Sequence, residues 1–155
     1  MDVVLFLAFL AACVAAASTG ALFAPGAWYD GLTKPWWTPP PLVFPIVWTV
    51  LYLAMSYAAS RIGAQAATAG APVALALALW AVQIALNTLW TPVFFGLHRM
   101  RAGLVIIVLL WLAVAATTVQ FLRLDLVAGL LMLPYLLWVT IAAALNASVL
   151  RLNRA

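Results

Sequence analysis

The chain has 155 residues, of which 69% are hydrophobic and only 6% are charged, with a formal net charge of +4 at pH 7. Because a soluble domain carries about 25% charged residues, this composition excludes a soluble globular protein and indicates an integral membrane protein in a lipid bilayer. The pI near 9.9 reflects basic residues placed between apolar segments, and gives no indication of nucleic-acid binding.

Five apolar runs follow one another along the chain, at about residues 3–23, 44–62, 73–97, 102–122 and 126–150. Each is near the roughly 20 residues that a membrane-spanning helix needs, and none shows the alternation of a transmembrane barrel. Backbone groups in lipid must be satisfied within the protein. The sequence therefore predicts one all-α membrane domain over residues 1–155, a five-transmembrane-helix bundle with a long first loop.

The first run carries two features of targeting signals. It follows Met1 and Asp2 instead of a basic segment, and it is long for a secretory signal, so we expect a retained helix. The residues before Cys13 resemble a lipoprotein cleavage box, but without upstream basic residues we interpret Cys13 as packed on this helix. A single cysteine excludes an internal disulfide.

The first loop combines large rings and prolines in the stretch WYDGLTKPWWTPPP, residues 28–41. Prolines fix backbone angles and favour a stiff, extended chain, and exposed rings contribute nothing to a solvated linker. We therefore expect the loop to cap the mouth of the bundle, with Tyr29, Trp36 and Trp37 turned inward. Lys34 can then pair with a carboxylate of a ligand.

Three later helices carry aromatic stripes with hydrogen-bonding groups, because residues three, four or seven apart share a helix face. Asn87 lies deep in its helix, where an amide facing lipid would be costly, so it forms either a helix–helix hydrogen bond or a ligand contact. Pro92 and Pro134 interrupt spans and free the carbonyls of Thr88 and Leu130. A cavity with such walls suits a flat apolar ligand with a polar rim; the stripes comprise Trp48 and Tyr52, then Asn87, Trp90 and Phe94, then Tyr135, Trp138 and Ala142.

Other chemistry is not indicated. The acids Asp2, Asp30 and Asp125 are scattered, no metal-binding cluster appears, and no span has a charge near its centre to carry protons. His98 lies in a basic turn, where it is either a solvated residue or a haem ligand, and we favour the former. Anchoring or packing accounts for Trp28, Trp80 and Trp111.

Basic residues set the expected orientation. Lys34, Arg99, Arg101, Arg151 and Arg154 fall on one side of the five spans, whereas Arg61 and Arg123 fall on the other. The positive-inside rule therefore predicts a cytoplasmic C-terminus.

Taken together, these segments resemble the TspO/translocator protein family of tryptophan-rich sensory proteins, which includes the peripheral-type benzodiazepine receptor. The resemblance spans nearly the whole chain. It rests on WYDGLTKPWWTPP at residues 28–40, FPIVWT at 44–49, LNTLWTPVFFG at 86–96, LPYLLW at 133–138 and LN at 145–146.

The resemblance implies a bacterial-type membrane receptor or sensor that binds porphyrins, such as protoporphyrin IX or haem, as ligands and not as obligatory cofactors. Synthetic isoquinoline carboxamide and benzodiazepine drugs are further expected ligands. By matching motif positions, the pocket comprises Tyr29, Trp48, Asn87, Trp90, Trp138 and Ala142; the spacing and the loop add Lys34, Trp37, Tyr52 and Phe94.

The family is commonly dimeric, and Ala74, Ala78, Ala81 and Ala85 give the third span a small-residue strip suited to helix packing. Sterol binding is less supported. The family's C-terminal sterol pattern lacks its tyrosine here, although Leu53, Tyr57 and Arg61 fit a loose version of it.

Three alternatives to a receptor remain open from the sequence. The first is an enzyme that degrades protoporphyrin in light, with Trp48 and Trp138 as redox partners. The second is a transporter of porphyrin or sterol. The third is a membrane scaffold whose aromatic residues only pack.

Overall fold

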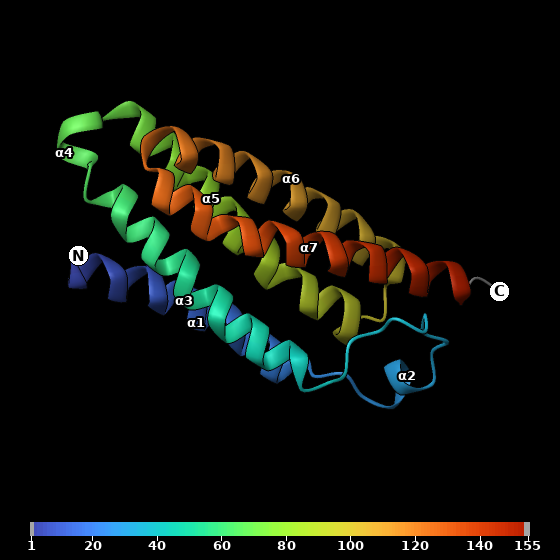
Figure 1. Cartoon of the computed structure of the whole chain (residues 1–155). Helices are drawn as coiled ribbons and strands as arrows, with labels where there is room; N and C mark the ends of the chain where they lie inside the picture. The colour runs from blue at the N-terminus through green and yellow to red at the C-terminus, as the bar shows by residue number, and fades with distance from the viewer. Residues whose placement is uncertain (1, 154–155) are drawn as a thin grey trace.

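The computed structural model describes residues 2–153 (Figure 1). Five of its helices are long and apolar enough to cross a membrane, which confirms the predicted fold class. The elements in chain order are α1 Val3–Leu22, α2 Ala27–Asp30, α3 Val43–Gly63, α4 Ala66–Ala69, α5 Ala71–Thr91, the π-helical turn η1 Pro92–Gly96, α6 Met100–Leu124 and α7 Leu126–Leu152.

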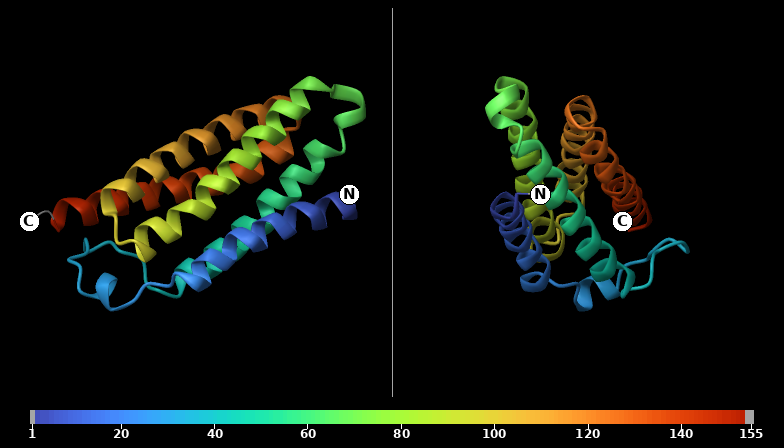
Figure 2. Two further views of the ribbon diagram at one scale, coloured as in Figure 1. Left: turned by 180° about the vertical axis from the view of Figure 1, so that it is seen from behind. Right: turned by 60° about the vertical axis from the view of Figure 1, so that its left-hand side comes forward.

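The five long helices form one bundle in which α1 packs on α3 and α5, α3 on α7, and α6 between α5 and α7 (Figure 2). The first loop (residues 23–42), the turn between η1 and α6, and the end of α7 lie together, and we call this the loop end. The start of α1, the short helix α4 and the junction of α6 with α7 lie at the opposite end. Antiparallel neighbours follow from the short connections after α3.

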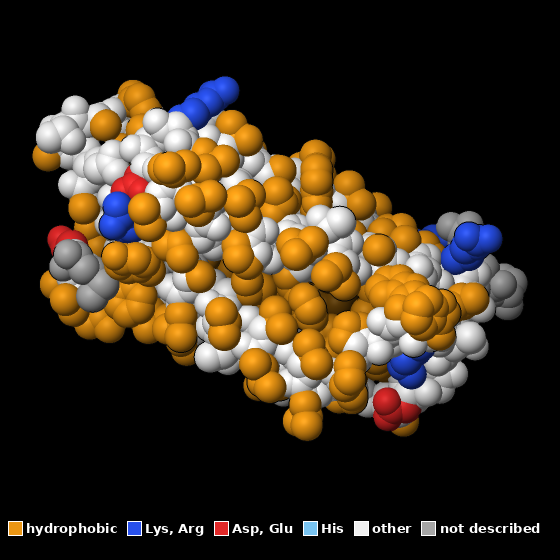
Figure 3. Space-filling model, viewed as in Figure 1, with side chains coloured by type: hydrophobic (Ala, Val, Ile, Leu, Met, Phe, Trp, Pro, Cys, Tyr) orange, Lys and Arg blue, Asp and Glu red, His pale blue; other side chains and the backbone are white. Residues whose placement is uncertain are grey.

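Hydrophobic side chains cover the flank of the bundle shown in Figure 3, whereas Lys, Arg and Asp gather at its two ends. The interior is filled by large side chains such as Met55, Phe121 and Tyr135, which are fully buried. Exposed leucines and valines on every long helix face the surroundings. This distribution is that of a bundle whose flanks are solvated by lipid.

Two sets of small side chains differ in burial: Cys13 lies inside the bundle, and the alanine strip of α5 lies on its surface. Cys13 is fully buried on α1, where the hydroxyl of Ser56 donates a hydrogen bond to its sulfur over 3.2 Å. The alanine strip of α5 is exposed along its length, and dimerisation through it stays a prediction; the strip comprises Ala74, Ala78, Ala81 and Ala85.

The prolines in the spans act in two ways. Pro92 begins η1, where the amide of Leu97 donates to the Pro92 carbonyl over 2.8 Å and the amide of Arg99 donates to Val93 over 3.1 Å. This wider turn follows the loss of the proline donor. Pro134, by contrast, lies within a helix that continues to Leu152.

The two short helices were not predicted from the sequence. α2 follows Pro25 and Gly26 inside the first loop, and α4 lies in the connection between α3 and α5. Each has 4 residues, too few for a hydrophobic period to register. The first loop is therefore partly helical and not extended throughout.

Candidate ligand-binding cavity

A cavity of about 1030 Å³ lies at the loop end and is lined by residues of α1, α3, the α5–η1 segment, α7 and the first loop. Figure 3 shows the molecule hollowed between α3 and α7 on this side, with hydrophobic side chains around the hollow. Seven of the ten residues predicted for the site line it: Tyr29, Lys34, Trp48, Tyr52, Trp90, Phe94 and Ala142.

The aromatic walls are built from pairs of packed rings. On α3, Trp48 stacks on Tyr52 with ring centroids 5.3 Å apart. On the opposite wall, Trp90 stacks on Phe94 at 5.0 Å and with only 14° between the ring planes. Tyr29 of the first loop meets Phe94 edge to face at 6.2 Å. These contacts fix ring faces and edges around the empty volume, which is the arrangement that receives a flat apolar ligand.

The three other predicted residues lie behind the lining. Trp37 packs into a small hydrophobic cluster with Phe94 and Val149. Trp138 is 8% exposed, and its ring meets Phe44, which does line the cavity, edge to face at 5.5 Å. Asn87 is 7% exposed. These side chains support the wall from outside instead of forming its surface.

Asn87 belongs to a hydrogen-bonded chain through the centre of the bundle. The Tyr52 hydroxyl donates to Asn87 Oδ1 over 3.1 Å, and Asn87 Nδ2 donates to the Tyr135 hydroxyl over 2.9 Å. Tyr135 in turn donates to Gln83 Oε1 over 2.9 Å. Of the two roles open to Asn87, the structure therefore shows the helix–helix hydrogen bond, and Tyr52 is the member of the chain that reaches the cavity.

Positive charge lies at the mouth of the cavity, on Lys34. Lys34 Nζ donates to the carbonyls of Asp30 and Leu32 over 3.2 and 3.4 Å, and lies 4.6 Å from the centre of the Tyr29 ring. Burial, and after it the Asp30 carboxylate, raise the pKa of Tyr29 above its ordinary value. Tyr29 is therefore a neutral phenol at physiological pH, and Lys34 supplies positive charge beside it.

Two attachments hold the first loop, and no sequence pattern indicates either of them. Thr33 exchanges two hydrogen bonds with the side chain of Asn153, each 2.9 Å long. Trp28 stacks on His98, with ring centroids 4.3 Å apart and 15° between the planes. His98 has a positive φ of 54°, and it is an exposed residue whose ring covers the loop tryptophan.

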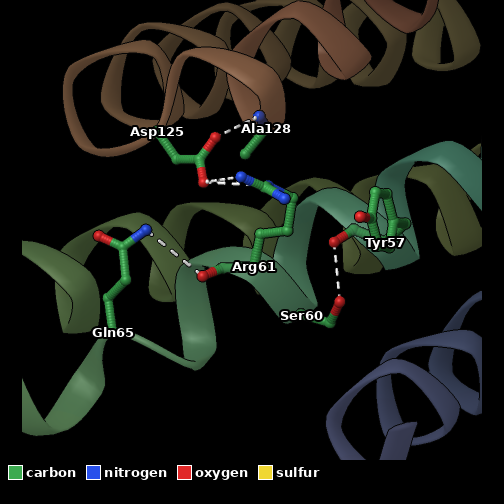
Figure 4. Close-up of polar contacts among 6 residues, drawn as sticks. All are labelled: Tyr57, Ser60, Arg61, Gln65, Asp125 and Ala128. Atoms are coloured by element: carbon green, nitrogen blue, oxygen red, sulfur yellow. Dashed lines mark hydrogen bonds and ion pairs between the residues drawn. The ribbon is translucent and has the colours of Figure 1, made fainter. Parts of the chain in front are cut away.

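The opposite end of the bundle is closed by an ion pair (Figure 4). Arg61 Nε and Nη2 both donate to Asp125 Oδ2, over 2.9 and 2.7 Å, while Asp125 Oδ1 accepts from the Ala128 amide at the start of α7. Burial opposes ionisation of Asp125, but its bonds to Arg61 and Ala128 outweigh it and lower the pKa of the carboxyl. Arg61 also lies over the ring of Tyr57, so the basic residue of the loose sterol pattern is engaged within the chain.

The architecture thus defines a class: a five-helix membrane protein with an aromatic cavity covered by its first loop. A model of the TspO/MBR family matches residues 8–152, and the chain belongs to this family.

The chain is similar in sequence to curated relatives over most of its length. It is 55% identical to the tryptophan-rich sensory protein of Cereibacter sphaeroides over 153 residues, covering 99% of this chain and 94% of that protein. It is 54% identical to the protein CrtK of Rhodobacter capsulatus, with 99% and 95% covered. Identity to the human translocator protein is 39% over 126 residues, which cover 81% of this chain and 75% of the human protein.

Proposed function

We propose that this membrane protein of the sensory and translocator family is a receptor that binds porphyrins in the loop-end cavity. The observation that carries the proposal is the cavity of about 1030 Å³ with aromatic walls. Its volume is at the upper end of the range of small-molecule sites. A tetrapyrrole has the flat apolar faces that stacked rings accept.

Polarity at the cavity supports the same ligand class. Trp90 Nε1 donates to Asn146 and the Tyr52 hydroxyl donates to Asn87. These donors of the deep wall are therefore already hydrogen-bonded within the protein. Positive charge is at the mouth, on Lys34. We infer that the macrocycle enters the apolar depth while a propionate stays beside Lys34, where it remains partly hydrated.

The test is a tryptophan-fluorescence titration of the purified protein with protoporphyrin IX. Ala142→Leu adds bulk to the cavity wall, and Ala144→Leu adds the same bulk at an exposed position of the same helix. We expect saturable quenching that Ala142→Leu weakens at least about tenfold, the effect of losing ~1.4 kcal/mol of binding, and that Ala144→Leu leaves intact. Equal quenching in all three proteins would contradict binding in the cavity.

A second candidate is the light-dependent breakdown of porphyrin by dioxygen. It is favoured by the position of Trp48, which lines the cavity and has Tyr52 and Tyr135 at ring-centroid distances of 5.3 and 5.9 Å. Illuminated protein should then convert protoporphyrin IX to a product in air, and Trp48→Phe should slow the conversion. Trp111→Phe is the control, since Trp111 bonds Thr140 away from the cavity. Unchanged turnover in Trp48→Phe would leave receptor binding as the function.

We further infer that the loop end faces the cytoplasm. The described basic residues at this end are Lys34, Arg99, Arg101 and Arg151, and Arg154 lies outside the described residues. Cysteine placed at position 151 should react with a membrane-impermeant maleimide only after the membrane is opened, and the buried Cys13 should stay silent. Labelling in intact cells would show the opposite orientation and contradict this inference.

A further inference from the structure

The hydrogen bonds between Thr33 and Asn153 connect the first loop with the far end of the chain. The Thr33 amide donates to Asn153 Oδ1, and Asn153 Nδ2 donates back to the Thr33 carbonyl, both over 2.9 Å. Nδ2 also donates to the Val149 carbonyl over 2.8 Å, which anchors the amide to the last turn of α7. The Asn153 side chain thus bonds both the backbone N–H and the backbone C=O of Thr33. This pairing requires an amide side chain, which carries one accepting oxygen and one donating nitrogen.

The segment held in this way forms one side of the cavity mouth. Thr33 precedes Lys34 and follows Leu32, which packs in a cluster with Tyr29 and the buried Val149. Tyr29, Lys34 and Val149 all line the cavity. Lifting residues 29–34 away from α7 would therefore open the cavity to the surroundings of the loop end.

Little else of a polar kind attaches this loop to the bundle. Across residues 2–153, the two bonds to Asn153 are the only hydrogen bonds between residues 24–41 and residues 71–153. Prolines stiffen the part of the loop from Pro35 to Pro41. Besides these two bonds, the loop is held by the stack of Trp28 on His98 and by apolar contacts such as that of Tyr29 with Phe94. The bonds to Asn153 are therefore the polar attachment that holds the loop around Thr33 to the end of the chain.

We propose that Asn153 is a positioning residue that latches the first loop over the cavity, and that breaking its two bonds to Thr33 limits the escape of the bound ligand. This inference rests on the proposed function for its second half, since it names what the latch retains. The closed loop covers the cavity at the loop end and holds Lys34 at the mouth, so ligand release through the loop end requires the latch to open first.

The first measurement needs no ligand. Hydrogen exchange of the Thr33 amide reports directly on the bond to Asn153 Oδ1. In Asn153→Ala both bonds are lost, and we expect exchange at Thr33 to accelerate about tenfold, the scale of two partly exposed hydrogen bonds. Asn153→Asp keeps the acceptor for the Thr33 amide and loses the donor. The exchange rate of the Thr33 amide in this variant should therefore lie between those of the wild-type protein and Asn153→Ala.

The second measurement is the dissociation rate of protoporphyrin IX, followed by stopped-flow fluorescence in the same proteins. Asn153→Ala should release the porphyrin about tenfold faster, with a smaller change in the association rate, because interface changes act mainly on dissociation. Leu152→Ala alters the neighbouring residue, which is 48% exposed, and should leave both rates unchanged. A general weakening of α7 would instead lower thermal stability in both variants.

Each outcome decides a separate part of the inference. Unchanged exchange at Thr33 in Asn153→Ala would overturn the latch itself. Faster exchange with an unchanged dissociation rate would show that the loop does not limit escape, which overturns its role in retention. If the wild-type protein showed no saturable porphyrin binding, the proposed function would fail, and hydrogen exchange would still decide whether the latch exists.

Discussion

At the loop end, the helices enclose a cavity that is covered by a separate segment with few polar attachments. At the opposite end, Arg61 and Asp125 bind α3 directly to the start of α7, and α6 passes into α7 through Asp125 alone. The first end has unfilled volume and a cover that can detach. At the second end, Arg61 and Asp125 neutralise each other in an ion pair between two helices.

The contrast shows how one small bundle separates stability from binding. Close packing and an ion pair fix the helices at one end, so the other end can keep the aromatic side chains apart around a cavity. Such a cavity forfeits packing contacts. The chain of hydrogen bonds from Gln83 to Tyr52 lies between the two ends and connects the packed interior with the cavity wall.

The largest effect should come from the tight junction of α6 and α7. A Cβ added at Gly129 would lie 2.6 Å from Leu122 Cα and still closer to its side chain, and backbone cannot give way as a side-chain tip can. We expect Gly129→Ala to lower the free energy of unfolding by ~3 kcal/mol, measured by denaturation in detergent. Gly20→Ala, where an added Cβ meets nothing within 4 Å, is the control. Equal stability of the two variants would contradict a rigid end.

The next effect concerns the polar chain between the ends. Tyr135→Phe removes the hydroxyl that accepts from Asn87 and donates to Gln83, leaving both amides without that partner. The expected loss of stability is ~1.5 kcal/mol, together with weaker porphyrin binding because Tyr52 loses its support. Tyr57→Phe, at the ion-pair end, should change neither property. Normal binding in Tyr135→Phe would show that the chain is not coupled to the cavity.

A smaller effect is expected for the ion pair, whose Arg61 side chain is 34% exposed and therefore screened by solvent. Asp125→Asn should cost ~1 kcal/mol at pH 7. Because the folded-state pKa of Asp125 is lowered, the pair stabilises fully above the unfolded pKa of about 3.9 and its contribution is lost as pH falls through the folded-state value. In thermal unfolding between pH 7 and pH 3, the gap between wild type and variant should therefore stay constant down to about pH 3.9 and narrow below it; a gap that stays constant to pH 3 would argue against the pair.

The smallest effect should come from the neighbouring loop tryptophans. Trp36 is 96% exposed, contrary to the expectation that its ring turns inward, whereas Trp37 packs into the cluster around Phe94. Trp36→Ala should change the free energy of unfolding in detergent by less than ~0.5 kcal/mol, and Trp37→Ala should cost more. Titration with denaturant distinguishes them, and a larger loss for Trp36→Ala would mean that the loop packs differently.

Long hydrophobic runs made the five spans predictable, because lipid imposes one length and one hydrogen-bonding solution on each. The helix ends differ from the predicted ones by a few residues, as at Val43–Gly63 against 44–62. Aromatic spacing also placed Trp48, Tyr52, Trp90 and Phe94 on faces that the cavity uses. These are properties of single helices, and the sequence alone determined them.

What only the tertiary structure decided are the contacts between segments distant in sequence. Thr33 and Asn153 are 120 residues apart, and Arg61 and Asp125 are 64 apart, so no local period connects them. The same holds for Asn87, whose hydrogen bond to Tyr135 depends on the position of another helix. Helix rotation and loop closure set these pairings, because a polar group finds its partner only after the apolar faces have packed.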